Sequence, residues 1–423
     1  MKAIIDQILK KFITTGQLEV RWPDGTLSTY RGKEGPSARF ALRDAATLRR
    51  LLLSPSLALG EAYMDGGLVP EDCSIYDVLD VLTLNAAQNE TAHPALRLRA
   101  FMGRLFRRIA QFNSASRARR NVAHHYDLNG RLYSLFLDRD RQYSCAYFPT
   151  GNETLEEAQA AKKLHIAAKL KLDRPDLSVL DIGSGWGGLA LTLARDFGAR
   201  VLGITLSSEQ LAESRARAEA EGLADRVRFE LMDYRAVNER FDRIVSVGMF
   251  EHVGVGFYRT FFATIKRCLA PNGVALLHTI GRSDGPASTD RWLQKYIFPG
   301  GYSPALSEVM PAIEKTGLIV TDVEVLRLHY AQTLRQWRRR FAANRDAIAA
   351  LYDERFCRMF EFYLAGAELA FRHGGHVNFQ IQMVRDQTVL PLTRDYMFEA
   401  ERAGAGRLAQ TAPAHAAQGM ASS

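Results

Sequence analysis

The sequence contains an aspartate followed by four closely spaced glycines, a combination suited to holding a ligand. Asp181 lies near the end of a short apolar run, and the glycines Gly183, Gly185, Gly187 and Gly188 complete the pattern D-x-G-x-G-x-G-G. Glycines let the backbone adopt positive φ and approach a ligand, and a helix that begins there offers free N–H groups. The spacing departs from the dinucleotide fingerprint G-x-G-x-x-G. Because an acid at this point suits a cationic amino group, the pattern favours S-adenosylmethionine (SAM) over a dinucleotide or mere tight packing.

Further polar residues follow other apolar runs of the same region. Thr205 and Gln210 stand where an acid often binds a ribose, and Asp233 follows a third run, where it could accept a hydrogen bond from an adenine amino group. Glu251 follows a fourth run and His278 ends a fifth. If these runs are parallel strands, their carboxyl ends share one edge of the sheet, and the polar side chains converge on one pocket.

The elements that position these residues can be read from apolar runs and turn signals. Strands are expected at 177–182, 200–205, 226–231, 241–247 and 273–280, with helices at 187–197, 207–221 and 257–270. A further helix begins at Thr154, where Glu157 completes a capping box. This alternation predicts an α/β fold, a doubly wound, Rossmann-like parallel sheet.

The remaining chain divides into three further segments. The sequence predicts a small α+β domain at residues 1–95, with a hairpin around Pro23-Asp-Gly25. We expect this domain to have a packing or lipid-handling role. The sequence further predicts a basic linker helix at 96–122 and the catalytic domain at 123–400. The segment 401–423 is rich in Ala, Gln and Ser and is predicted to be a disordered tail.

The basic segment bears on the partner. Between Arg97 and Arg120 there are eight arginines and no acid, and apolar residues at 98, 101, 102, 105, 109 and 112 fall on one helical face. With a net charge of +8, this favours an anionic membrane surface. The alternative is a linker helix docked on the core with a solvated basic face. A nucleic acid is disfavoured, because no base-stacking aromatics on strands accompany the charge.

The composition excludes several classes of protein. No run of about 18 apolar residues is present. The four cysteines lie far apart without CxxC spacing, which argues against a disulfide framework or a metal site. Together with an N-terminus that has no cleavage-type signal, this predicts a cytoplasmic protein, peripherally associated with the inner membrane.

Nine motifs, taken together, resemble the cyclopropane-fatty-acyl-phospholipid synthase family and its mycolic acid methyltransferase relatives. They are LGEAYMDG at 59–66, HYD at 125–127, YSCAYF at 143–148, TLEEAQ at 154–159, LDIGSGWGGLA at 180–190, GITLSSEQ at 203–210, FEHVG at 250–254, LHTIG at 277–281 and HY…TL…W at 329–337. The resemblance therefore covers nearly the whole chain.

The resemblance implies two sets of site residues. The SAM-binding set comprises Tyr143, Ser144, Asp181, Gly183, Gly185, Gly187, Thr205, Leu206, Gln210, Asp233 and Tyr234. The catalytic set, which would hold a bicarbonate ion, comprises Cys145, Glu251, His278, Ile280 and Tyr330. A homodimer is suggested by the family alone.

The expected function follows from the resemblance. It is SAM-dependent transfer of a methylene group to the cis double bond of unsaturated phospholipid acyl chains, through a carbocation that bicarbonate deprotonates. The complete bicarbonate set favours ring closure over a methyl-branched product. The alternatives are that methyl-branched product, an RNA or amine methyltransferase, and a non-catalytic lipid-binding protein. The sequence does not specify chain length, double-bond position or headgroup.

Overall fold

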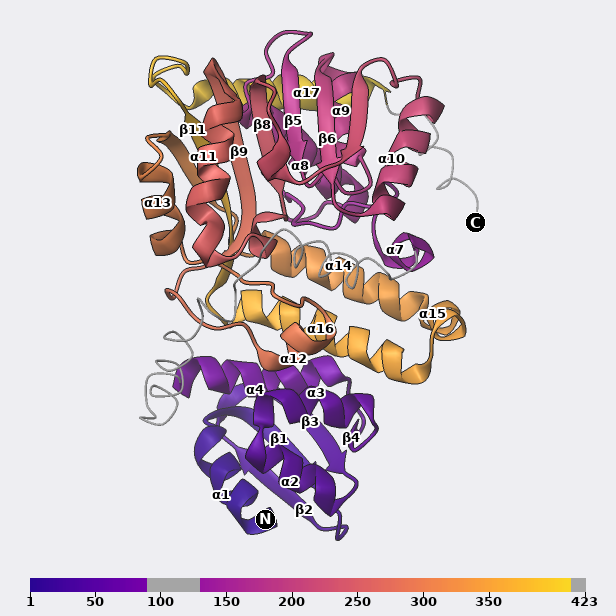
Figure 1. Cartoon of the computed structure of the whole chain (residues 1–423). Coiled ribbons are helices and arrows are strands. Elements are labelled where there is room, and N and C mark those ends of the chain that lie inside the picture. The colour runs from indigo at the N-terminus through magenta and orange to yellow at the C-terminus, as the bar shows by residue number, and fades with distance from the viewer. Residues whose placement is uncertain (90–129, 412–423) are drawn as a thin grey trace.

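The computed structural model describes residues 1–89 and 130–411 of the chain (Figure 1). The predicted basic linker helix at 96–122 and the HYD motif lie outside the described residues. The N-terminal domain forms one end of the molecule, the large sheet forms the other, and helices α14 (His329–Ala343) and α16 (Glu354–Arg372) lie between them (Figure 1).

The N-terminal domain is a small α+β unit. Its sheet has the strand order β2-β1-β3-β4, in which β1 and β3 are parallel and the other pairs are antiparallel. Buried positions alternate with partly buried ones along β1 and the second half of β3, so that Leu18, Val20 and Phe40 enter one hydrophobic core. The elements are α1 (Lys2–Phe12), β1 (Thr15–Arg21), β2 (Leu27–Arg31), β3 (Lys33–Leu42), α2 (Ala45–Leu53), α3 (Pro55–Met64), β4 (Leu68–Pro70) and α4 (Ile75–Asn89).

The larger domain is built on a seven-stranded sheet of order β10-β11-β9-β8-β5-β6-β7. Strand β5 pairs in parallel with β6 on one side and with β8 on the other, so the strand order reverses there. Such a switch point is where ligands bind in open α/β sheets. The strands are β5 (Ser178–Ile182), β6 (Arg200–Thr205), β7 (Val227–Leu231), β8 (Phe241–Val247), β9 (Leu269–Arg282), β10 (Ile319–Val325) and β11 (His376–Val384).

Helices cover both faces of this sheet, as the predicted doubly wound fold requires. On one face, Ile166 of α8 and Leu193 of α9 pack against Val179 and Val201 of the strands. On the other, Phe262 of α11 joins a separate core with β8, β9 and β11. The helices are α7 (Gly130–Phe136), α8 (Leu155–Lys169), α9 (Gly188–Phe197), α10 (Ser208–Ala220), α11 (Tyr258–Cys268), α12 (Arg291–Tyr296), α13 (Leu306–Glu314), α15 (Arg345–Leu351) and α17 (Asp395–Thr411).

Two features of the fold differ from the sequence-based prediction. The sheet is not entirely parallel, because β11 runs antiparallel to both β9 and β10. The disordered tail predicted from residue 401 is wrong for its first part, since α17 continues to Thr411. The side chain of Glu401 on this helix contacts the buried ring of His165 on α8. This ion-pair partner anchors a segment whose composition alone indicates disorder.

No helix within residues 1–89 and 130–411 combines the length and apolar character that crossing a bilayer requires. The capping box predicted at the start of α8 is confirmed. Thr154 Oγ1 accepts from the backbone N–H of Glu157, and the carboxylate of Glu157 accepts from the N–H of Thr154.

Candidate active site

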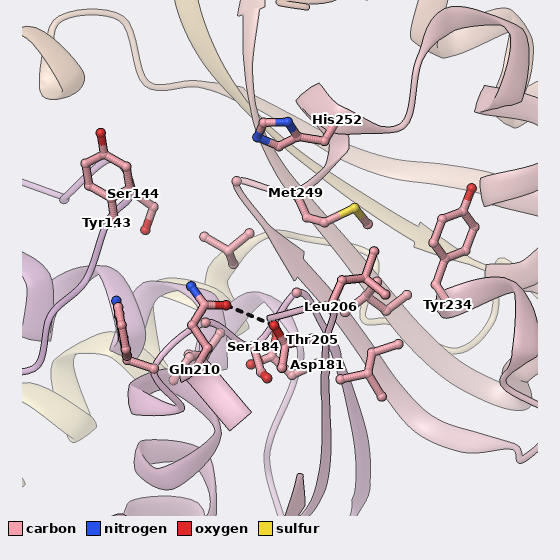
Figure 2. A pocket seen from close by; sticks show the side chains of 18 of the residues that line it. Tyr143, Ser144, Asp181, Ser184, Thr205, Leu206, Gln210, Tyr234, Met249 and His252 are labelled. Atoms are coloured by element: carbon pink, nitrogen blue, oxygen red, sulfur yellow. Dashed lines mark hydrogen bonds between the residues drawn. The ribbon is translucent and has the colours of Figure 1, made fainter. Parts of the chain in front are cut away.

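A cavity opens at the carboxyl ends of the parallel strands, at the switch point beside β5. Ten of the eleven residues predicted to bind SAM line it. Figure 2 shows Tyr143 and Ser144 on one side, Tyr234 on the opposite side, and Asp181, Ser184 and Thr205 between them. The exception is Gly187, which directly precedes the first residue of α9. Its φ is 84°, and a Cβ at this position would meet the ring of Phe229. The ten are Tyr143, Ser144, Asp181, Gly183, Gly185, Thr205, Leu206, Gln210, Asp233 and Tyr234.

The glycine turn brings the backbone to the cavity. Gly183 and Gly185 have φ values of 87° and 55°, a region that a side chain disfavours. A Cβ on Gly183 would lie 2.8 Å from the Cβ of Met249, whereas a Cβ on Gly185 would meet nothing within 4 Å. The turn therefore exposes backbone at Gly185 that a ligand can approach directly.

Asp181 places an unsatisfied carboxylate oxygen at the cavity. Its Oδ2 is buried without a hydrogen-bond partner among the described residues, and so is Oγ of Ser184. Burial raises the pKa of Asp181 to about 7, an effect that the charge of Lys162 partly opposes. A buried acceptor left unpaired costs free energy, and a cationic ligand group would relieve that cost. This fits the amino group predicted to bind there.

The ends of β6 and β7 form the wall near Tyr234. Thr205 Oγ1 donates to Gln210 Oε1 over 2.9 Å, as the dashed line in Figure 2 shows. Both carboxylate oxygens of Asp233 accept from the guanidinium of Arg235, at 2.8 and 2.6 Å. Asp233 is therefore held as a carboxylate beside the cavity, with its orientation set by an ion pair.

Glu251 lies next to this cavity, between the lining residues Met249 and His252. Its Oε1 accepts from the backbone N–H of Ile280 at 2.6 Å, and its Oε2 is buried without a hydrogen-bond partner in the described part of the chain. Burial raises the pKa of Glu251 to about 7. Two predicted catalytic residues thus meet directly, and one oxygen remains available.

His278 is engaged by side chains that the sequence analysis did not consider. Asn378 Nδ2 lies 2.8 Å from its Nε2, and Gln380 Nε2 lies 3.0 Å from its Nδ1. A neutral imidazole has one donor and one acceptor, so one amide must present its oxygen. Gln380 Oε1 has no other partner among the described residues. An anion can therefore bind His278 only by displacing an amide.

The remaining two predicted catalytic residues belong to a separate core cluster. Cys145 and Tyr330 are buried in it, and Ile280 packs against the same cluster. Burial raises the pKa of the Cys145 thiol, so the thiolate that a nucleophilic cysteine needs does not form at neutral pH. The structure thus links Glu251 to this cluster through Ile280.

Several cavity residues were missed by the sequence analysis. They include Gln142, Trp186, Met249, His252 and Arg235. His252 directly follows Glu251 in the FEHVG motif, and burial lowers its pKa to about 4, which keeps the ring neutral at pH 7. Adjacency to a predicted catalytic residue is the one signal that could have identified it.

The strand order, the glycine turn and the acid at the end of β5 together define the chain as a SAM-dependent methyltransferase. Residues 113–381 match the family model described as mycolic acid cyclopropane synthetase, and the chain belongs to this family. Residues 4–91 match a second model, described as a domain of unknown function.

Individual relatives agree with this assignment. The chain is 42% identical to the cyclopropane-fatty-acyl-phospholipid synthase of Escherichia coli strain K12, over 77% of this chain and 82% of the relative. It is 35% identical to a tuberculostearic acid methyltransferase of Mycobacterium tuberculosis, over 91% of both chains. A crystal structure of a mycolic acid cyclopropane synthase complexed with SAH and CTAB aligns with a TM-score of 0.60 at 33% identity, covering 64% of this chain and 99% of that one.

If Asp181 binds the amino group of SAM as predicted, its raised pKa should make SAM affinity dependent on pH. Burial raises the pKa of Asp181 to about 7, so its carboxyl group becomes increasingly protonated below pH 7 and would then not attract a cationic amino group. We expect the dissociation constant to be roughly five to ten times higher at pH 6 than at pH 7.5, in line with the fraction ionised. Calorimetric titration with SAM at both values measures it.

The control for this prediction is Asp181→Asn. It should bind SAM weakly at both pH values, because it carries no titrating group at this position. A variant that kept the wild-type pH dependence would assign that dependence to another residue.

Proposed function

We propose that this chain transfers a methylene group from SAM to the cis double bond of unsaturated phospholipid acyl chains and forms a cyclopropane ring. The observation that carries the proposal is the buried carboxylate of Glu251, which stands beside the SAM cavity with Oε2 unpaired. The Escherichia coli relative, named for this activity, supports it.

The chemistry needs both the cavity and the carboxylate. The alkene is a poor nucleophile, so the site must align it with the electrophilic methyl group that SAM supplies. A carbon–carbon bond forms as the methyl–sulfur bond breaks, sulfur keeps the electron pair, and the other alkene carbon becomes a cation. Loss of a proton from the new methyl group then closes the ring. The products are the cyclopropane, S-adenosylhomocysteine and one proton.

The residues around Glu251 suit a bound bicarbonate ion. When bound, bicarbonate supplies the base for the departing proton. Glu251 Oε2 offers an acceptor for its hydroxyl group, and the Cys145 backbone and the Tyr330 hydroxyl complete the predicted set. His278 would join only after one of its amide partners moves. Because the site is buried, a fixed charge there stabilises a cation strongly.

The proposed partners follow from charge and from the family. A net charge of +8 favours an anionic phospholipid surface, which the basic segment at 97–120 would contact. We place the protein in the cytoplasm at the inner membrane, as a homodimer, without nucleic acid. A methyl-branched product is the second candidate, because the similarity to the tuberculostearic acid methyltransferase spans 91% of this chain and 91% of that relative.

Incubation of the purified protein with methyl-labelled SAM and vesicles of monounsaturated, partly anionic phospholipid tests the proposal. Mass analysis of the released fatty acids should show a gain of one CH2 with loss of the double bond. A branched chain that retains a double bond has the same mass as the cyclopropane but still reacts as an alkene, and finding it would assign the branched product instead. No label in lipid, with label in RNA or a small amine, would overturn the lipid assignment.

A further inference from the structure

A buried lysine that no predicted set contains lies directly behind one wall of the cavity. Lys162 of α8 is 1% exposed. Its Nζ donates to Gln142 Oε1 over 2.6 Å and to Ser144 Oγ over 2.9 Å, and both of these residues line the cavity. In the part of the chain that the structure describes, no carboxylate forms a salt bridge with it. Its hydrogen bonds go to neutral oxygens, and the charges of Asp138 and Asp140 offset its burial only in part, because the pKa of Lys162 stays lowered. A buried ammonium of this kind is costly, which calls for a functional account.

The lysine fixes which way the hydrogen bond between Lys162 and Ser144 runs. An ammonium group only donates, so Ser144 Oγ must accept from Lys162 and keeps its own hydrogen for another partner. No acceptor for that hydrogen is found among the described residues. Gln159, one turn earlier on α8, fixes the backbone of the same residue, with its Nε2 3.0 Å from the Ser144 carbonyl. Ser144 is therefore a held donor at the cavity wall.

A hydrogen-bond acceptor lies elsewhere in the same cavity. Asp181 Oδ2 is a buried acceptor without a partner among the described residues, and it feels the charge of Lys162. Burial lowers the pKa of Lys162 to about 8, so the side chain remains mostly protonated at pH 7. The cavity thus presents a donor backed by a cation and, separately, an acid. These match the carboxylate and the ammonium of a zwitterionic amino acid.

We propose that Lys162 is a positioning residue of the SAM site, which makes the Ser144 hydroxyl a donor to the ligand's carboxylate and places a positive charge behind it. The proposal concerns SAM binding and holds whichever acceptor is methylated. It predicts that Lys162 acts on the amino-acid end of the ligand and not on its nucleoside.

Two ligands separate these ends. S-adenosylhomocysteine carries the amino acid, whereas 5′-methylthioadenosine has the same nucleoside and sulfur without it. In calorimetric titrations of the full chain, Lys162→Met should weaken S-adenosylhomocysteine at least about tenfold, the range of a hydrogen bond to a charged group. Its affinity for 5′-methylthioadenosine should stay within about twofold of wild type.

Two further variants control the experiment. Lys169→Met removes another lysine that is 1% exposed on the same helix but contacts Asp322 and Glu324, so both ligands should bind as in wild type. Ser144→Ala should reproduce the selective loss, and adding Lys162→Met to it should weaken S-adenosylhomocysteine by less than the product of the two single effects, because only the charge contribution of Lys162 is left to remove. If Lys162→Met fails to fold, Ser144→Ala carries the test. Equal weakening of both ligands, or none, would overturn the proposal.

Discussion

Glu251→Gln should lower the rate of methylene transfer by about 100-fold to 1000-fold while leaving SAM binding unchanged. The side chain lies beside the cavity, with Oε1 held by the Ile280 N–H at 2.6 Å and Oε2 unpaired. An amide of the same shape keeps the packing but loses the negative charge that opposes the developing cation. Removing such a preorganised group typically costs about 100-fold to 1000-fold in turnover, or roughly 3–4 kcal/mol. Product formation at saturating SAM, measured by mass analysis, gives the turnover rate.

The pH dependence of turnover gives a second measure of the same residue. Burial raises the pKa of Glu251 to about 7, so its carboxylate form is lost as the pH falls through 7. Turnover at saturating SAM and lipid should therefore rise with pH across that value, and the residual rate of Glu251→Gln should not follow this titration.

Glu368→Gln is the matched control for Glu251→Gln. Glu368 of α16 is 1% exposed, pairs with Arg338 of α14 and with Arg372, and does not line the cavity. Its loss should lower the free energy of unfolding and leave turnover of the folded enzyme intact. If Glu251→Gln turned over at the wild-type rate, or lost SAM binding as well, its proposed role would be wrong.

Gly185→Ala should weaken SAM binding by tenfold or more and should lose no more stability than a control glycine variant outside the cavity. Gly185 lines the cavity at φ 55°, and a Cβ there would meet no protein atom within 4 Å, so the methyl group would enter ligand space. Gly222→Ala is the control, because that glycine has φ 66° and equally open surroundings but does not line the cavity. In both variants an alanine at positive φ should lower the free energy of unfolding by about 1–2 kcal/mol.

Comparing the two variants separates strain from steric exclusion. Thermal unfolding should show similar losses for both, and calorimetry should show weakened SAM binding for Gly185→Ala alone. Gly183→Ala should lose both properties, because its Cβ would lie 2.8 Å from the Cβ of Met249. Wild-type affinity in Gly185→Ala would mean that the ligand does not approach this turn.

The core of the fold and the cofactor side of the site were predictable because their signals are local. A buried parallel strand appears as a short apolar run, and the glycines after β5 stand within six residues of one another. The chain order of these runs, together with the rule that parallel strands share one edge, is enough to bring Asp181, Thr205 and Asp233 together. No contact between distant segments had to be known.

What the sequence left undetermined depends on partners far apart along the chain. The amides that engage His278 come from β11, about 100 residues later, and they alternate with apolar residues in a strand that is buried on both faces. The helix at 395–411 continues past residue 401, where Glu401 meets His165, 236 residues away. Nothing in the sequence analysis singled out Lys162, yet it is buried behind Ser144. Local patterns specify elements and the ends of strands, whereas burial and hydrogen-bond partners arise only when those elements pack.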